Sequence, residues 1–176
     1  MRLRLTSSRV ILLITIALIV LPGLVLPSPY YFRVGALVFI SALAVIGLNL
    51  LMGYAGQVSL GHAGSFGIGG YCTAILPAHY GWDPLLAAAT GILLAAVLAY
   101  IVGRPILRLK GHYLAVATLG LGILIAMVLN AEVAFTGGPD GMAVKRAAIF
   151  GMRLRSPETW YWISGAVLVV GVAFAF

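Results

Sequence analysis

Polar side chains and glycines recur at close intervals in the segment from Asn49 to Tyr71, which is otherwise apolar. In the hydrocarbon of a membrane each unpaired polar side chain would cost several kcal/mol, so the segment needs protein or an aqueous cavity around it. Hydrogen-bonding groups in such a cavity could bind a polar solute and let it pass. The residues that we expect to form this polar lining are Asn49, Gln57, Ser59, His62 and Ser65.

The glycines of this segment leave room for two backbones to approach closely, and we expect such contacts at Gly53, Gly61 and Gly67. If the segment is helical, four-residue spacing aligns two faces of small and polar residues. One face holds Gly53, Gln57, Gly61, Ser65 and Gly69, and the other holds Ala55, Ser59, Ala63 and Gly67. The alternative is a tightly packed structural helix that binds no solute, in which His62 is a hydrogen-bonded structural histidine.

Few other residues offer chemistry. The phosphate-binding pattern GxxxxGK[ST] does not occur in the sequence, so no ATP-binding signature is present. His62, His79 and His112 are too scattered for a metal site. No acidic residue lies inside a clearly apolar run, which argues against a proton relay. Cys72 has no disulfide partner in the chain. We therefore expect no enzyme activity, no cofactor and no metal.

The composition shows whether this chain folds in water or in a membrane. Of its 176 residues, 62% are hydrophobic and 9% are charged, and the mean hydropathy is +1.12. A soluble domain has roughly 25% charged residues, so this chain is an integral membrane protein. Its net charge of +7 comes from basic residues that lie mostly between apolar runs, where they orient membrane spans. A nucleic-acid partner is therefore not expected.

The apolar runs predict an all-α integral membrane protein, a polytopic helical bundle of about six membrane segments. The segment Gly56–Leu76 is the least apolar of them, so it needs neighbouring helices and could be broken or re-entrant. Since the basic residues show little bias between the two sides, the orientation of the loops after residue 76 stays open. The predicted segments are Val10–Leu26, Val34–Met52, Gly56–Leu76, Leu85–Val102, Tyr113–Leu129 and Trp160–Phe176.

Two connections carry residues that could contact a partner. The segment Gly103–His112 is predicted to be a solvent-facing loop or a short surface helix. Its basic residues Arg108 and Lys110 could touch anionic headgroups or a partner subunit, or could simply orient the neighbouring spans. The motif TGGPDG at Thr136–Gly141 predicts a sharp turn. Its candidate contact residues are Gly137, Gly138, Pro139 and Gly141.

Three segments in order resemble the permease subunits of branched-chain amino acid ABC importers, and the likeness is closer to the M-type of the two paired permeases. They are GLNLLMGYAGQVSLGHAGSFGIGGY (47–71), LKGHYLAVATLGLG (109–122) and LNAEVAFTGGPDGM (129–142). The family turn often carries Asn where this chain has Asp140, and both residues suit a turn.

This resemblance implies a multi-pass permease in the lipid bilayer of the bacterial inner (plasma) membrane. A second permease subunit would pair with it, and cytoplasmic ABC ATPase subunits would supply the energy. A periplasmic binding protein would deliver an apolar amino acid, and the TGGPDG turn could receive that protein if its loop is periplasmic.

Members of this family continue through further spans and carry a cytoplasmic loop that docks onto the ATPase, and no such loop occurs in this sequence. We therefore expect residues 1–176 to form a single transmembrane permease domain that is incomplete at the C-terminus. One alternative is a permease for another small solute such as a sugar. Another is a truncated, non-transporting membrane assembly partner. A carrier built from inverted repeats is disfavoured, because no second glycine-rich segment matches the first.

Overall fold

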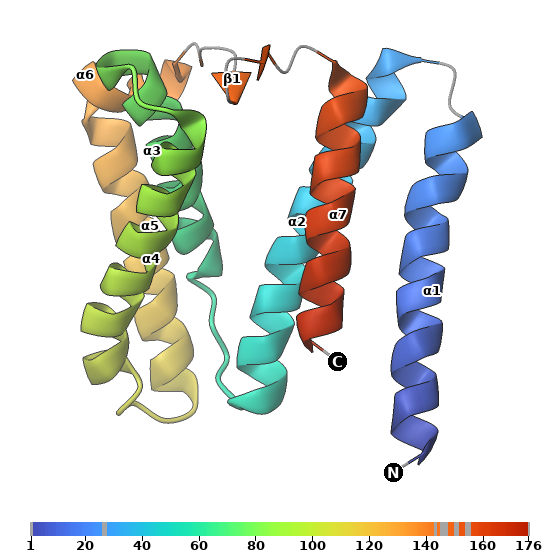
Figure 1. The fold of residues 1–176 in the computed structure, drawn as a ribbon. Coiled ribbons are helices and arrows are strands. Elements are labelled where there is room, and N and C mark those ends of the chain that lie inside the picture. The colour runs from blue at the N-terminus through green and yellow to red at the C-terminus, as the bar shows by residue number, and fades with distance from the viewer. Residues whose placement is uncertain are drawn as a thin grey trace. The chain divides into compact units, whose positions relative to one another are not determined.

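Helices dominate the fold. A computed structural model describes residues 2–25, 28–142, 144, 148–149, 152–153 and 156–175. The two short strands form one antiparallel pair. The elements in Figure 1 are α1 (Arg2–Val25), α2 (Pro29–Tyr54), α3 (His62–Tyr80), α4 (Pro84–Ile106), α5 (His112–Ala131), α6 (Val133–Thr136), the 3-10 helix η1 (Gly138–Asp140), β1 (Ala148–Ile149), β2 (Met152–Arg153) and α7 (Pro157–Ala175).

Several helices have the length and the apolar surface of membrane spans. Among the described residues, four helices are long and apolar enough to cross a membrane, namely α2, α4, α5 and α7. The apolar part of α1, Arg9–Val25, is shorter, and α3 is not one of the four. Most of the apolar side chains of these helices face outward, as contact with lipid requires. The prediction of an all-α polytopic membrane protein is confirmed.

Helix α4 begins one residue earlier than its apolar run, because Asp83 and Pro84 form a strong start signal. The Asp83 carboxylate accepts a hydrogen bond of 2.8 Å from the Leu85 N–H, and Pro84 occupies the first turn, where its missing N–H costs nothing. Helix α3 continues through Pro77, and the connection consists of residues 81–83.

The glycine-rich segment is broken, as the sequence allowed. Helix α2 ends at Tyr54 and α3 begins at His62, so residues 55–61 are not helical. The continuous helical faces that four-residue spacing suggested are wrong, because Gly53 lies on α2 and the residues from Ala55 to Gly61 lie in the break. Only Ala63, Ser65, Gly67 and Gly69 lie on α3. The break has contacts of its own, since the Leu60 N–H donates to the Thr118 hydroxyl.

The chain packs as two compact units. Unit 1 centres on Tyr161 of α7, which is only 1% exposed. Its hydroxyl donates to the carbonyl oxygen of Ile19 on α1 at 2.7 Å. Its ring packs edge-on against Phe32 and tilted against Phe39, both on α2, with centroids 5.3 and 4.9 Å away. Unit 1 comprises Met1–Leu50 and Leu154–Phe176, and unit 2 comprises Leu51–Arg153.

Unit 2 is built around α3, which packs against both α4 and α5 (Figure 1). The contact between α3 and α4 is close because Gly91 of α4 has no side chain. A β-carbon at Gly91 would lie 3.1 Å from the Cβ of Cys72 and 3.2 Å from the carbonyl oxygen of Gly69. Cys72 is therefore a small packing residue.

Candidate functional site

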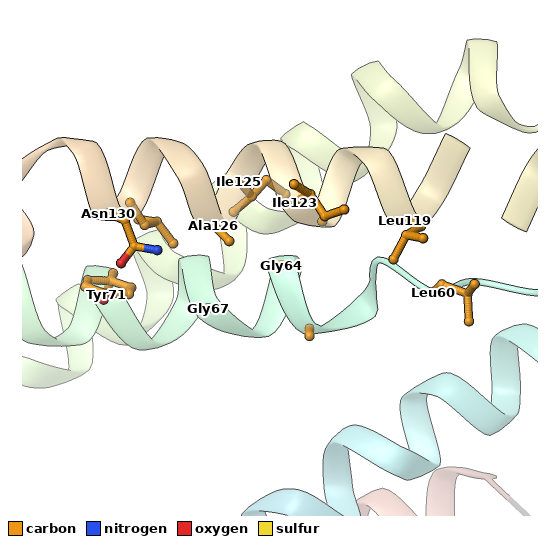
Figure 2. Close-up of a pocket in the computed structure, with 12 residues that line it drawn as sticks. Leu60, Gly64, Gly67, Tyr71, Leu119, Ile123, Ile125, Ala126 and Asn130 are labelled. Atoms are coloured by element: carbon orange, nitrogen blue, oxygen red, sulfur yellow. The ribbon is translucent and has the colours of Figure 1, made fainter. Parts of the chain in front are cut away.

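A groove of about 330 Å³ runs between α3 and α5 inside unit 2 (Figure 2). It extends from Leu60, in the helix break, to Asn130, near the C-terminal end of α5. Its lining on the α3 side is formed by Leu60, Ala63, Gly64, Gly67 and Tyr71. The lining from α5 includes Leu119, Gly122, Ile123, Ala126 and Asn130.

Glycines bring the two sides of this groove close together. A β-carbon at Gly64 would lie 3.2 Å from the Cα of Gly122 and 2.9 Å from the Cδ1 of Ile125. At Gly67 the nearest atom to such a carbon would be the Leu129 Cδ1, at 3.6 Å. The groove therefore narrows toward the break, where the backbones of α3 and α5 touch, and has more room at Gly67.

The groove is mostly apolar, with polar groups at one end. Figure 2 shows the Asn130 amide and the Tyr71 ring near one another at that end, whereas aliphatic side chains line the rest. Asn130 is exposed and Tyr71 is half-buried. The amide and the phenol can each donate and accept hydrogen bonds. A small amphipathic solute with an aliphatic body and a polar head matches this arrangement chemically.

The sequence-predicted polar lining is not gathered in this groove. Only Gly67 of the predicted residues lines it, and Gly61 lies against α5 just beside it. Gln57 and Ser59 are half-buried in the break, and His62 and Ser65 are half-buried in the first turn of α3. Their role in a solute pathway stays a prediction. Two further predicted residues, Asn49 and Gly53, lie exposed on α2.

Sequence reasoning missed Asn130, Tyr71 and Thr118. Asn130 was visible as a polar residue that ends an apolar run, and Tyr71 as the last residue of the glycine-rich segment. Thr118 carried no signal, since a threonine in an apolar helix usually bonds to its own backbone. In the structure it also accepts a hydrogen bond from the Leu60 N–H at 3.1 Å, 58 positions away in sequence.

The TGGPDG motif forms the predicted turn, and Thr136 is its buried centre. Its side chain is 2% exposed, and its Oγ1 lies 2.6 Å from the Leu129 carbonyl oxygen, to which it can donate. The Thr136 Oγ1 also accepts a hydrogen bond from the Gly138 N–H at 3.0 Å. Gly137, Gly138 and Gly141 all have positive φ, at 78°, 61° and 71°. Contact of this turn with a partner stays a prediction.

The basic loop is shorter than predicted, because α4 extends to Ile106. Arg108 and Lys110 are exposed in the turn that leads to α5. Arg104 stays on α4, with its guanidinium carbon 4.5 Å from the centre of the Tyr100 ring. Across the described part of the chain, no group of three or more His, Cys, Asp and Glu side chains could hold a metal ion.

Comparison with known proteins identifies the family of this chain. The family model described as "Branched-chain amino acid transport system / permease component" matches residues 30–176. The high-affinity branched-chain amino acid transport system permease protein LivM of Escherichia coli (strain K12) is 36% identical over 123 residues, which cover 68% of this chain and 28% of that protein. The LivM protein of Salmonella typhimurium (strain LT2) is 36% identical over 122 residues, with coverages of 66% and 28%.

The chain thus spans 28% of the length of these curated relatives. No solved structure matches it. The matched residues include all of unit 2 and therefore the groove and the helix break. With its apolar helices, the chain is a multi-pass protein of the bacterial inner membrane. It belongs to the family of branched-chain amino acid transport system permease components.

Proposed function

We propose that this chain is a permease component of an ABC importer that moves branched-chain amino acids across the bacterial inner membrane. The observation that carries this proposal is the family match over residues 30–176, which contains the whole of unit 2. The relatives with 36% identity are named as branched-chain amino acid transport permeases. The two units would then belong to a single permease domain.

The groove between α3 and α5 is the place where we expect the solute to pass. A branched aliphatic side chain suits the surface made by Leu119, Ile123 and Ala126. The amide of Asn130 and the hydroxyl of Tyr71 suit the polar amino-acid head group. The half-buried polar residues of the break would extend this lining, and the glycine contacts would let helices shift against each other without side-chain clashes.

The energy and the solute would come from other chains. Since the sequence contains no phosphate-binding motif, ATP hydrolysis is assigned to cytoplasmic ABC ATPase subunits. A second permease subunit and a periplasmic binding protein would complete the importer. Arg108 and Lys110 at one end of unit 2 are candidates for contact with one of these partners or with lipid headgroups. The TGGPDG turn at the other end is a candidate for contact with the binding protein.

Uptake in cells tests this function. Deletion of the gene is expected to reduce uptake of radiolabelled leucine, isoleucine and valine and to leave sugar uptake unchanged. Restoring the gene at its own locus should restore uptake. A deletion strain that takes up all three amino acids normally would contradict the proposal. If sugar uptake falls instead, the chain serves another solute, and if uptake falls only because the other membrane subunits are lost from the membrane, the chain is an assembly partner.

A pair of variants tests the groove itself. Ala126 lines the groove and Ala96 of α4 does not, and both side chains are exposed within the chain. Ala126→Leu should reduce leucine uptake because the added methyl groups fill the groove. Ala96→Leu adds the same volume elsewhere and should leave uptake unchanged. Equal effects of the two substitutions would exclude the groove as the site.

A further inference from the structure

Thr118 links the helix break to α5. Its Oγ1 accepts a hydrogen bond from the Leu60 N–H at 3.1 Å, and its hydroxyl donates to the Ala115 carbonyl oxygen at 2.9 Å. The second bond keeps the hydroxyl proton on its own helix, so the oxygen lone pairs are left to face the break. The hydroxyl is therefore oriented to receive one N–H from a segment that has no helical partner for it.

The backbones around this hydrogen bond are in direct contact. A β-carbon on Gly61 would collide with the carbonyl oxygen of Thr118, and one on Gly122 would lie 3.0 Å from the Cα of Gly61. The end of the break therefore rests on one turn of α5 with no side chain between them. The hydrogen bond fixes the position of residue 60 along this contact.

Leu60 is also part of the groove, whereas Thr118 is not among the residues that line it. Any change at Thr118 thus reaches the groove through the position of Leu60. Ser59 and Gln57 precede Leu60 by one and three residues and share the same non-helical segment. Their placement depends on the same anchor.

We infer that Thr118 is a positioning residue, whose hydroxyl holds Leu60 and the polar break in the arrangement that solute passage requires. This inference rests on the proposed transport function. Thr118 contacts no solute itself. Loss of its acceptor oxygen would let residues 57–60 adopt other conformations while α5 and the rest of unit 2 stay folded, because α3 also packs against α5 at Gly64 and against α4 at Gly91.

Graded substitutions at Thr118 test this inference in the intact importer. Thr118→Ser keeps the acceptor, Thr118→Cys offers a weaker one, and Thr118→Val removes it at nearly constant volume. Thr90→Val is the matched control, because among the described residues the Thr90 hydroxyl bonds only within its own helix, 2.8 Å from Ala87 O and 3.0 Å from Leu86 O. Leucine uptake, normalised to the amount of protein in the membrane, should fall in the order Ser, Cys, Val.

Hydrogen exchange supplies a readout that a general loss of stability would not produce. The Leu60 amide should exchange about tenfold faster in T118V, the ratio expected for loss of one hydrogen bond, while amides within α4 keep the wild-type rate. T90V should match the wild type in exchange and in uptake. Wild-type uptake in T118V at equal abundance would overturn the inference. So would faster exchange throughout unit 2, which would indicate a purely structural role.

The two proposals fail in different ways. If the wild-type protein moves no leucine, the transport function is wrong, but the Leu60 exchange rate still shows whether Thr118 holds the break. If the wild type transports leucine and T118V transports it equally well, the function stands and the positioning role is wrong. If T118V does not accumulate in the membrane, the Ser and Cys variants decide, and equal uptake by these two would overturn the inference.

Discussion

Gly61 and Gly122 meet backbone to backbone where the helix break reaches α5, since a β-carbon on Gly122 would lie 3.0 Å from the Cα of Gly61. The two residues are 61 positions apart in sequence, and their contact closes the narrow end of the groove. A glycine is required on the Gly61 side in particular, because the atom that a β-carbon would meet there is a backbone oxygen of Thr118, which cannot move without α5.

Gly61→Ala should therefore destabilise unit 2, by about 1–3 kcal/mol if the clash is relieved by a backbone shift. Gly120→Ala, on α5 itself, is the control, because a β-carbon there would meet nothing within 4 Å. Alanine also favours a helix over glycine by about 1 kcal/mol, so the control should be neutral or stabilising. Thermal unfolding, followed by the reaction of Cys72 with a thiol-reactive fluorophore, compares the two. Equal midpoints would contradict the predicted clash.

The sequence predicted only one partner of these close contacts, the glycine-rich segment. Gly61 and Gly67 stood out because glycine at short intervals in an apolar run permits close approach. Their partner helix could not be named, because Gly122 lies in a run that periodicity describes only as an apolar span. The sequence left open whether this segment is a broken helix. The break depends in part on the hydrogen bond to Thr118 and on the contact with α5, and both join residues far apart in the sequence.

The site was harder to predict than the fold. Apolar runs located the ends of α2, α4, α5 and α7 to within five residues, because each span must cross the same thickness of hydrocarbon and satisfy its backbone groups internally. Helix α1 begins eight residues before its apolar run, and α3 begins six residues after its own. Polar residues inside the glycine-rich segment were the natural candidates for a lining. Asn130 and Tyr71 are instead the polar groups of the groove, because the packing of α3 on α5 decides which side chains share a cavity.

Thr136→Val should destabilise the turn after α5. Valine keeps the volume but removes the oxygen that accepts from the Gly138 N–H at 3.0 Å, and both residues are buried. An unsatisfied buried N–H costs about 1–3 kcal/mol. Faster hydrogen exchange at Gly138 should accompany the lower unfolding midpoint, and Thr136→Ser should retain both wild-type values. An unchanged exchange rate in T136V would show that water replaces the hydroxyl.

Alanine substitutions at two glycines of the same turn distinguish the cost of backbone strain from the cost of a side-chain collision. Gly138 and Gly141 both have positive φ, at 61° and 71°. A β-carbon at Gly138 would also meet the Val133 Cγ2 at 2.9 Å, whereas at Gly141 it would meet nothing within 4 Å. Gly141→Ala should cost about 1–3 kcal/mol from backbone strain alone, because Gly141 lies at φ 71° and ψ −177°, a conformation that essentially only glycine adopts. Gly138→Ala should cost more, as measured by thermal unfolding. The reverse order would mean that strain at residue 141 dominates.

Tyr161→Phe tests the centre of unit 1. The substitution keeps the ring against Phe32 and Phe39 but removes the hydroxyl that donates to Ile19 O at 2.7 Å. Hydrogen bonds between membrane helices are worth about 0.6 kcal/mol on average and up to about 1.7, so a loss in that range is expected. The control is Tyr113→Phe, because the Tyr113 side chain is 77% exposed. Titration with a denaturing detergent, followed by circular dichroism, measures both, and equal midpoints would exclude this hydrogen bond as a stabilising contact.

Substitutions at the polar end of the groove test its role in solute recognition. Asn130→Leu and Tyr71→Phe each remove hydrogen-bonding capacity while leaving an apolar side chain of similar size in the lining. If these groups meet the head group of the amino acid, each loss should reduce leucine uptake about three- to tenfold at subsaturating concentration, as one hydrogen bond implies. Tyr100→Phe, whose ring lies on α4 and does not line this groove, should transport like the wild type. Uptake kinetics decide the point, since unchanged transport in both groove variants would mean that the head group is recognised elsewhere.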